Sequence, residues 1–300
     1  MVHVALVGTT ASGKSALALA LARRDPSVEL VSVDSMQVYR GMDIGTAKAS
    51  PAERADVPHH LLDLADPWER FTVTRFQHHF RATLAAIEAR GGRAVLVGGT
   101  GLYLRAVVDD LAIPEEFPEV RAELDTEPDT VALHRRLGRL DPVAATRMEP
   151  TNRRRVVRAL EVTIGSGRRF SSYGPGLETY PPSRFRLLGV DLPAEVVAER
   201  IALRYRDQLA QGFVAEVTRL ADDPRGLSPT ARQALGYREL LAHRAGDLAL
   251  DDAVELAISR TRRFARRQRA WFRRDPRIEW FSADDPAGIL EPLAETVLAD

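Results

Sequence analysis

Short apolar runs alternate with longer amphipathic stretches through the N-terminal third of the chain. Each apolar run has the length of a buried strand, and each amphipathic stretch could form a helix that covers it. Strands that alternate with helices predict a parallel sheet with right-handed crossovers, whose carboxyl edge is the usual place for ligands. The expected strands are 4–7, 28–34, 59–64 and 94–97, and the expected helices are 16–22 and 73–90.

The pattern changes at about Pro114. Residues 114–185 are rich in Pro, Glu and Arg and show helical periodicity, but they contain no run that predicts a buried strand. We therefore expect a helical insertion domain at 114–185 within an α/β core domain formed by 1–113 and 186–300. We expect the insertion to contain helices at 130–140 and 153–164. The second part of the core should contain strands at 186–191 and 277–281. Its helices are expected at 194–211, then one that ends at 220, one that begins at about 230, one that begins at about 251, and one at the end of the chain.

Residues 8–15 connect the first expected strand to the first expected helix. A phosphate-binding loop requires this order, because N–H groups of the loop and of the helix N-terminus then point at the anion. The alternative is an ordinary turn that contains a lysine by chance. Lysine is rare in this chain, since Lys14 and Lys48 are the only lysines and the other residues among the 42 lysines and arginines are arginines. Lys14 would add positive charge, and the Ser15 hydroxyl would ligate a Mg²⁺ ion that bridges two phosphates. The expected diphosphate-binding residues are Gly8, Thr9, Thr10, Ala11, Ser12, Gly13, Lys14 and Ser15.

Two more loops emerge at the same edge of the expected sheet. Asp34 ends the second strand, and Gly98-Gly99-Thr100-Gly101 follows the strand at 94–97. In P-loop kinases a carboxylate at this place faces the acceptor and can take its proton; the alternative is that Asp34 caps a turn or a helix. Thr100 could donate to a phosphate or to the acceptor, or it could belong to a simple strand-to-helix connector.

A dense cationic stretch occupies residues 259–274. On a helix, Ala265 and Phe272 fall on one apolar stripe, and arginines flank that stripe on both sides. No acidic residue occurs within the stretch, so its charges suit the phosphates of a nucleic acid. A second arginine cluster, 152–158, opens a helix of the expected insertion. The alternative is that both are solvated surfaces of an arginine-rich protein.

Composition limits the classes of function. The formal net charge is zero, so any binding of nucleic acid has to come from local patches. The chain has no cysteine, which excludes disulfides, thiolate metal sites and a cysteine nucleophile. It enters a strand almost at once, and no apolar run approaches the ~20 residues of a membrane helix. We therefore expect a cytoplasmic protein with no signal peptide and no membrane span.

Several of these segments together resemble the tRNA dimethylallyltransferases, or tRNA delta(2)-isopentenylpyrophosphate transferases. The resemblance runs in order from residue 8 to residue 273 and is most specific at 34–48. Thr9 replaces a proline usual in the family, and Arg267 stands near a family lysine, but neither difference removes a group that the chemistry needs. The other matching segments are 8–15, 58–60, 98–103, 152–161, 233–238 and 266–273.

The resemblance implies a P-loop NTPase-like fold and transfer of a dimethylallyl group from dimethylallyl diphosphate to a tRNA. The acceptor would be N6 of the adenosine on the 3′ side of the anticodon, in tRNAs that read codons beginning with U. Asp34 would deprotonate this amine, while Lys14, Thr100 and Arg204 would stabilise the leaving diphosphate together with Mg²⁺.

The resemblance also implies a set of tRNA-binding residues and a monomeric protein. These residues would bind the anticodon stem-loop, whose unpaired bases a protein can read. The insertion would contribute to this contact. The set comprises Asp34, Ser35, Met36, Gln37, Arg121, Arg154, Arg155, Arg158, Gly236, Tyr237, Arg238, Arg266, Arg267 and Gln268.

Three alternatives remain open at this point. A small-molecule or nucleotide kinase would use the same phosphate loop and turn over ATP without tRNA, but it gives no role to 34–48 or to the basic helix. An adenylate isopentenyltransferase would perform the same chemistry on free AMP and leaves the arginine clusters without a role. A non-catalytic RNA-binding protein leaves the phosphate loop and Asp34 unexplained.

Overall fold

The computed structural model describes residues 2–174 and 176–298, and the chain divides into two compact units. Unit 1 comprises Met1–Val108 and Pro182–Asp300, and unit 2 comprises Asp109–Pro181. Each unit has its own cluster of buried apolar side chains. The chain leaves and re-enters unit 1 at neighbouring points, because Ser183 Oγ donates to the carbonyl of Val108 at 3.3 Å.

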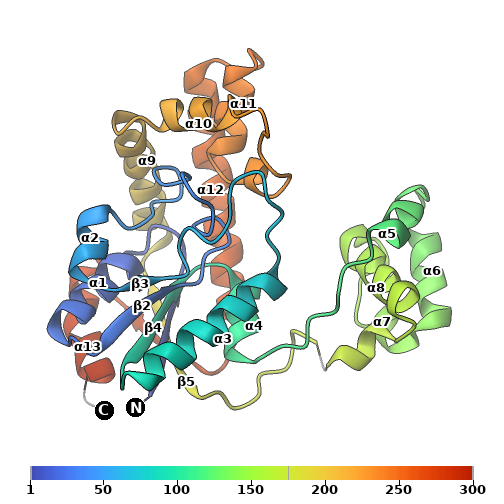
Figure 1. The fold of residues 1–300 in the computed structure, drawn as a ribbon, viewed down its shortest axis with the longest axis horizontal. Helices are drawn as coiled ribbons and strands as arrows, with labels where there is room; N and C mark the ends of the chain where they lie inside the picture. The colour runs from blue at the N-terminus through green and yellow to red at the C-terminus, as the bar shows by residue number, and fades with distance from the viewer. Residues whose placement is uncertain (1, 175, 299–300) are drawn as a thin grey trace. The chain divides into compact units, whose positions relative to one another are not determined.

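Unit 1 is built on one parallel sheet with the strand order β3-β2-β4-β1-β5-β6, flanked by helices (Figure 1). β1 is buried along its whole length and β4 along most of it, as expected of central strands covered on both faces. The strands are β1 (His3–Gly8), β2 (Val28–Ser32), β3 (His59–His60), β4 (Arg93–Gly98), β5 (Phe185–Asp191) and β6 (Ile278–Ser282).

The helices of unit 1 pack apolar stripes against this sheet. In α3, for example, Phe76, Phe80 and Leu84 recur one helical turn apart and are all buried. Among the described residues, no helix is both long and apolar enough to cross a bilayer. The helices are α1 (Lys14–Arg24), α2 (Pro51–Asp56), α3 (Val73–Ala89), α4 (Gly101–Val108), α9 (Ala194–Ala210), α10 (Phe213–Ala221), α11 (Tyr237–Arg244), α12 (Leu250–Phe272) and α13 (Ala287–Leu298), with the 3-10 helix η2 (Ala231–Gln233).

Unit 2 contains helices and no strand among its described residues. Its small core combines Leu133 and Leu137 of α6 with Val157 and Leu160 of α8. Three of its helices begin at side-chain caps, two from Asp and one from Asn, which satisfy free amides of the first turn. The helices are α5 (Pro118–Asp125), α6 (Thr130–Leu140), α7 (Pro142–Thr146) and α8 (Arg153–Ser166), with the 3-10 helix η1 (Phe170–Tyr173).

Two predicted elements of unit 1 are shorter than expected. The strand expected at 59–64 stops after two residues, because Leu61 and Asp63 have left-handed backbone with φ of 62° and 56°. The helix expected from about 230 begins only at Tyr237, after a 3-10 turn and a break at Gly236, whose φ is 86°.

The hydrophobic pattern does not predict α2. This helix of six residues buries none of its side chains, so it has no apolar stripe. Its signal is a capping box, in which Ser50 and Glu53 satisfy each other's backbone amides, with Pro51 at the start of the helix.

Candidate active site

The loop of residues 8–15 leads from β1 into the first turn of α1, so the free amides of that turn face the loop. Gly13 has a left-handed backbone, and a Cβ there would lie 2.7 Å from Pro286. The Ser12 hydroxyl is buried and has no hydrogen-bond partner among the described residues. An unpaired donor is costly unless a ligand satisfies it, so the loop has the features of an anion site.

Three cations lie at this loop. Arg200 Nε of α9 donates to the Ala11 carbonyl at 2.8 Å. Lys14 Nζ donates to the Thr9 carbonyl at 2.8 Å, and Arg204 Nη2 of α9 donates to Thr10 Oγ1 at 2.7 Å. The pKa of Lys14 is lowered to about 8, chiefly by burial and also by Arg204, while the Asp34 carboxylate acts in the opposite direction. Burial also lowers the pKa of Arg204. A bound diphosphate would relieve this repulsion and offset the cost of burying both charges.

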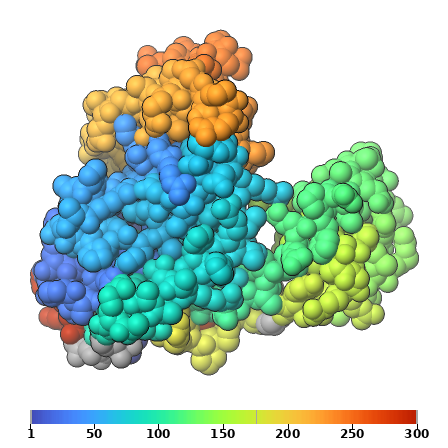
Figure 2. All heavy atoms as spheres, in the orientation of Figure 1, coloured from blue at the N-terminus to red at the C-terminus, as the bar shows by residue number. Residues whose placement is uncertain are grey.

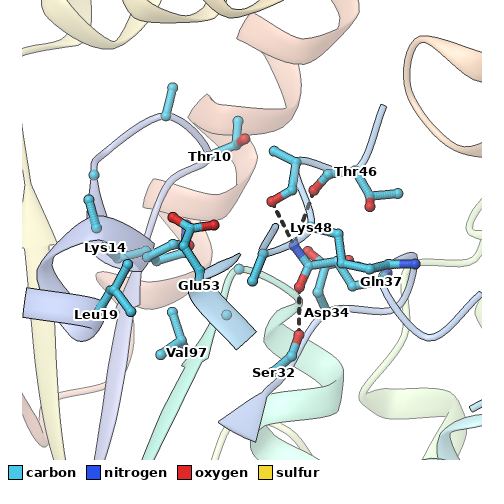
Figure 3. Close-up of a pocket in the computed structure, with 18 of the residues that line it drawn as sticks. Thr10, Lys14, Leu19, Ser32, Asp34, Gln37, Thr46, Lys48, Glu53 and Val97 are labelled. Atoms are coloured by element: carbon cyan, nitrogen blue, oxygen red, sulfur yellow. Dashed lines mark hydrogen bonds between the residues drawn. The ribbon is translucent and has the colours of Figure 1, made fainter. Parts of the chain in front are cut away.

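Asp34 follows β2 and faces the same cavity as Lys14 (Figure 3). Its Oδ1 accepts hydrogen bonds from the backbone amides of Met36 at 2.8 Å and Gln37 at 3.4 Å. Its Oδ2 accepts none from residues 2–174 or 176–298. Asp34 therefore caps a turn with one oxygen and keeps the other available for a substrate proton.

The cavity has a volume of about 430 Å³, which is within the range of small-ligand sites. The phosphate loop and Arg204 line one part of it, and residues 46–49 line another. Leu19, Leu30 and Val97 add apolar surface. The cavity thus suits a substrate that has an anionic head and a short hydrocarbon tail.

Thr100 and Gln268 connect the loops around this cavity. Thr100 Oγ1 accepts a hydrogen bond from the backbone amide of Ser35 at 3.2 Å. Gln268 of α12 is buried; its Oε1 accepts from the Thr10 amide at 2.8 Å, and its Nε2 donates to the Gly99 carbonyl at 2.8 Å. The expectation that Gln268 contacts tRNA needs correction, because both ends of its amide bind inside the fold.

Tyr237 also lies inside unit 1. Its side chain is completely buried, and its hydroxyl donates to Glu216 Oε1 at 2.5 Å. Gly236 is buried against the Phe213 ring, whereas Arg238 is exposed. Of the expected contact Gly236-Tyr237-Arg238, only Arg238 can reach an RNA, and the expectation for Tyr237 and Gly236 needs correction.

Ser35, Met36 and Gln37 are half-buried beside Asp34. Gln37 lines the cavity, but its amide is occupied: Oε1 accepts from Ser32 Oγ at 2.7 Å, and Nε2 donates to the carbonyls of Thr46 and Ala47 (Figure 3). Gln37 therefore braces the cavity wall and does not present a free amide to a base.

Four arginines at the C-terminal end of α12 and directly after it, at 266, 267, 269 and 273, fall into two groups. Arg269 and Arg273 form ion pairs with Asp191 at the end of β5, at 2.9 and 2.6 Å. Arg266 and Arg267 are exposed and form no ion pair with any described residue. Of these four arginines, only Arg266 and Arg267 are available for phosphates.

The expected tRNA-binding residues of unit 2 divide in the same way. Arg154 and Arg155 are exposed on the first turn of α8 and pair with no acidic side chain that the structure describes. Arg121 and Arg158 lie 3.5 and 2.6 Å from the buried carboxylate of Glu161. Arg154 and Arg155 are thus the free charges of this group, and the other two stabilise the unit.

Five ionisable residues that line the cavity were not among the expected site residues, namely Lys48, Glu53, His59, Arg200 and Asp207. Arg200, Arg204 and Asp207 recur at i, i+4 and i+7 on α9, so they share one face of that helix. This helical spacing is the sequence signal that could have placed Arg200 and Asp207 beside Arg204. Glu53 belongs to α2, whose capping box was the corresponding signal.

A metal ion at this site would depend on the ligand. Among the described residues, no group of three or more His, Cys, Asp or Glu side chains could hold one. Ser15 is exposed on the first turn of α1 and offers one hydroxyl oxygen. One protein oxygen together with phosphate oxygens and water fits Mg²⁺, which prefers such ligands.

These features define the class of the protein. A parallel sheet that carries a phosphate loop, three cations and a facing carboxylate is a P-loop fold equipped to transfer a group away from an anionic leaving group. A family model described as IPP transferase matches residues 37–275. The chain belongs to this family, the tRNA dimethylallyltransferases. A tRNA dimethylallyltransferase of Nocardioides sp. is 46% identical over 299 residues, which cover 99% of this chain and 96% of that protein.

Solved structures agree with this assignment. The full-length tRNA isopentenylpyrophosphate transferase of Bacillus halodurans is 34% identical, with a TM-score of 0.71 over 99% of this chain and 95% of that one. A eukaryotic dimethylallyltransferase acting on tRNA has a TM-score of 0.82 at 25% identity, over 99% of this chain and 78% of that one. The resemblance found in the sequence motifs, the P-loop fold and the class of enzyme are therefore confirmed.

Proposed function

We propose that the protein transfers the dimethylallyl group of dimethylallyl diphosphate to N6 of the adenosine on the 3′ side of the anticodon, in tRNAs that read codons beginning with U. The product is N6-isopentenyladenosine. One observation carries this proposal: a single cavity holds Asp34, with a free carboxylate oxygen, together with Lys14 and Arg204. An attacking amine and an anionic leaving group can therefore bind next to each other.

The loop of residues 8–15 would hold the diphosphate. Negative charge grows on its bridging oxygen as the carbon–oxygen bond breaks, and Lys14 and Arg204 would stabilise that charge. The anion raises the lowered pKa of Lys14, so the ammonium stays protonated as the diphosphate departs. Ser15 would hold a Mg²⁺ ion, which supplies further neutralisation of the diphosphate.

Asp34 Oδ2 would act as general base. N6 of adenine forms a bond to the allylic carbon, the electron pair of the breaking carbon–oxygen bond leaves with the diphosphate, and the N6 proton passes to Asp34. An aromatic amine is a weak nucleophile, so removing its proton while holding it in line lowers the barrier. Leu19, Leu30 and Val97 would contact the dimethylallyl group.

The tRNA would bind through exposed arginines of both units. These are Arg238, Arg266 and Arg267 of unit 1 and Arg154 and Arg155 of unit 2. Within residues 2–174 and 176–298, the one carboxylate close to any of them is Glu239, which lies 3.8 Å from Arg238. The insertion domain would contact the anticodon stem-loop. The target adenosine has to leave its stack to reach a cavity of this size.

Mass analysis of tRNA nucleosides after incubation with dimethylallyl diphosphate and Mg²⁺ tests the proposal. We expect N6-isopentenyladenosine in tRNA and no reaction with AMP. Prenylated AMP would indicate an adenylate isopentenyltransferase, ATP turnover without tRNA would indicate a kinase, and tRNA binding without a product would indicate a non-catalytic RNA-binding protein.

A further inference from the structure

Glu216 of α10 is a buried carboxylate without a cationic partner among the described residues. Its Oε2 accepts from the backbone amides of Asp43 at 2.9 Å and Ile44 at 2.8 Å, and its Oε1 accepts from the amide of Gly45 at 3.2 Å. Three successive amides that converge on one anion form a nest. Here the anion belongs to the protein itself, so Glu216 holds the loop that follows β2.

Tyr237 completes this arrangement from α11. Its hydroxyl donates to Glu216 Oε1 at 2.5 Å, and its ring packs on Gly45, where a Cβ would lie 2.4 Å from the ring. Burial and the Glu216 carboxylate raise the pKa of Tyr237, so the phenol stays protonated and remains a donor. Gln208 of α9 holds the other side of the loop by donating to the carbonyl of Ile44 at 2.6 Å.

The held loop continues directly into the cavity wall. Thr46 and Ala47 line the cavity, and their carbonyls accept from Gln37, three residues after Asp34 (Figure 3). Lys48 closes the loop with a fully buried ammonium that donates to the Tyr39 carbonyl at 2.7 Å. In Figure 2 the segment of α10 and α11 (yellow-orange to orange) lies against this part of the chain (blue). The contacts thus run from Tyr237 to the turn that orients Asp34.

We propose that Glu216 and Tyr237 are positioning residues for the transfer reaction: they hold residues 43–47 in place, and through Gln37 they fix the turn that presents Asp34 to the acceptor. This role rests on the proposed function. It accounts for Tyr237 without any contact to tRNA, and it places a determinant of the chemical step outside the cavity.

Two variants and one matched control test this inference. Tyr237→Phe removes one hydroxyl and keeps the ring on Gly45, and Glu216→Gln turns part of the acceptor into a donor that faces backbone amides. Tyr205→Phe is the control, because Tyr205 is also buried and its hydroxyl bonds to Thr261 at 2.9 Å and not to Glu216 or to the described backbone of residues 43–47. The readouts are hydrogen exchange of residues 41–48, kcat at saturating substrates, tRNA affinity and Tm.

We expect Tyr237→Phe and Glu216→Gln to speed amide exchange in residues 41–48 and to lower kcat roughly tenfold or more, since small displacements of a catalytic group are costly. The tRNA affinity should stay unchanged. Tyr205→Phe should lower Tm by about as much as Tyr237→Phe does. Its kcat and its amide exchange in residues 41–48 should match those of the unaltered protein. If Glu216→Gln does not fold, Tyr237→Phe alone decides.

Equal kcat values for Tyr237→Phe and Tyr205→Phe, or unaltered exchange of residues 41–48 in Tyr237→Phe, would overturn the inference. Failure of this inference can be distinguished from failure of the proposed function. If the unaltered protein makes no prenylated tRNA, the proposed function is wrong, and the exchange measurement still decides whether Tyr237 holds the loop.

Discussion

At the scale of single residues, the two carboxylate oxygens of Asp34 have different roles: one is bound by the backbone, and the other is available to the substrate. Oδ1 is fixed by the amides of Met36 and Gln37, whereas Oδ2 has no partner within the described chain. A base that is oriented by the backbone loses no freedom when the acceptor arrives, and this preorganisation is what general-base catalysis requires.

Asp34→Asn tests this division directly. The amide oxygen can still accept from the backbone and keep the turn, but the side chain can no longer take a proton. We expect kcat to fall by about two to four orders of magnitude while tRNA affinity is unchanged. Single-turnover prenylation and a tRNA-binding titration measure the two quantities, and a kcat close to that of the unaltered protein would remove Asp34 from the mechanism.

Lys14 gives the reaction a dependence on pH. Its pKa of about 8 is below the usual value, and a bound anion would raise this pKa. Binding is therefore fully favoured below pH 8 and weakens as the pH rises above it, by up to about tenfold per pH unit in KM for dimethylallyl diphosphate. In Lys14→Ala the KM should be higher and flat across this range; a rise that persists in this variant would assign the titration to another group.

At the scale of elements, α12 serves two surfaces at once. Its buried face brings Gln268 to the phosphate loop and places the Trp271 ring where a Cβ on Gly101 would lie 2.2 Å away. Glycine at 101 is thus required by the close approach of this helix. The exposed face carries Arg266 and Arg267, which the same helix presents away from the sheet.

Two double variants remove equal charge from the C-terminal end of α12 and the residue directly after it. Arg266→Gln with Arg267→Gln should weaken tRNA binding and flatten its dependence on salt, by about one unit of logarithmic slope for each phosphate that the variant no longer binds. Arg269→Gln with Arg273→Gln is the control, because these two side chains already pair with Asp191. Equal slopes for both double variants, measured by binding titrations over a range of salt, would contradict a direct phosphate contact.

Periodicity predicts the central elements well for a physical reason. β1, β4 and β5 are buried runs, so burial alone selects their residues. The end of β3 is different. Asp63 is held in its left-handed conformation by ion pairs with Lys48 and Arg54, and both of these residues lie outside the strand. Such an end is decided by tertiary contacts and has no local signal.

The same limit applies to the site. The phosphate loop and Asp34 could be predicted because strand, loop and helix are adjacent in the sequence. The motif around Tyr237 shows that a tyrosine stands there, but not whether it faces solvent or Glu216. Sequence likeness assigned Tyr237 and Gln268 to the tRNA, and packing places both in the interior.

At the scale of the whole molecule, all the residues that line the candidate active-site cavity belong to unit 1. Unit 2 has a separate apolar cluster, and the chain leaves and re-enters unit 1 at points joined by the bond from Ser183 to Val108. A unit that is inserted in this way can be removed without cutting the core.

Replacing residues 110–180 with a short glycine linker should therefore leave unit 1 folded. We expect this variant to bind dimethylallyl diphosphate like the unaltered protein and to bind tRNA much more weakly, because Arg154 and Arg155 are gone. Calorimetric titration with the diphosphate and a tRNA-binding assay check the two parts. Unchanged tRNA affinity would contradict a role for the insertion in holding the RNA.

The central claim is that the phosphate loop binds a group that leaves from carbon and does not transfer a phosphoryl group. The most direct measurement uses dimethylallyl diphosphate with a heavy oxygen isotope at the bridge between carbon and phosphorus, together with tRNA and Mg²⁺. The account predicts that all of the label is released in diphosphate, in an amount equal to the isopentenyladenosine formed. Label that remains on dimethylallyl alcohol, or release of orthophosphate without tRNA, would contradict it.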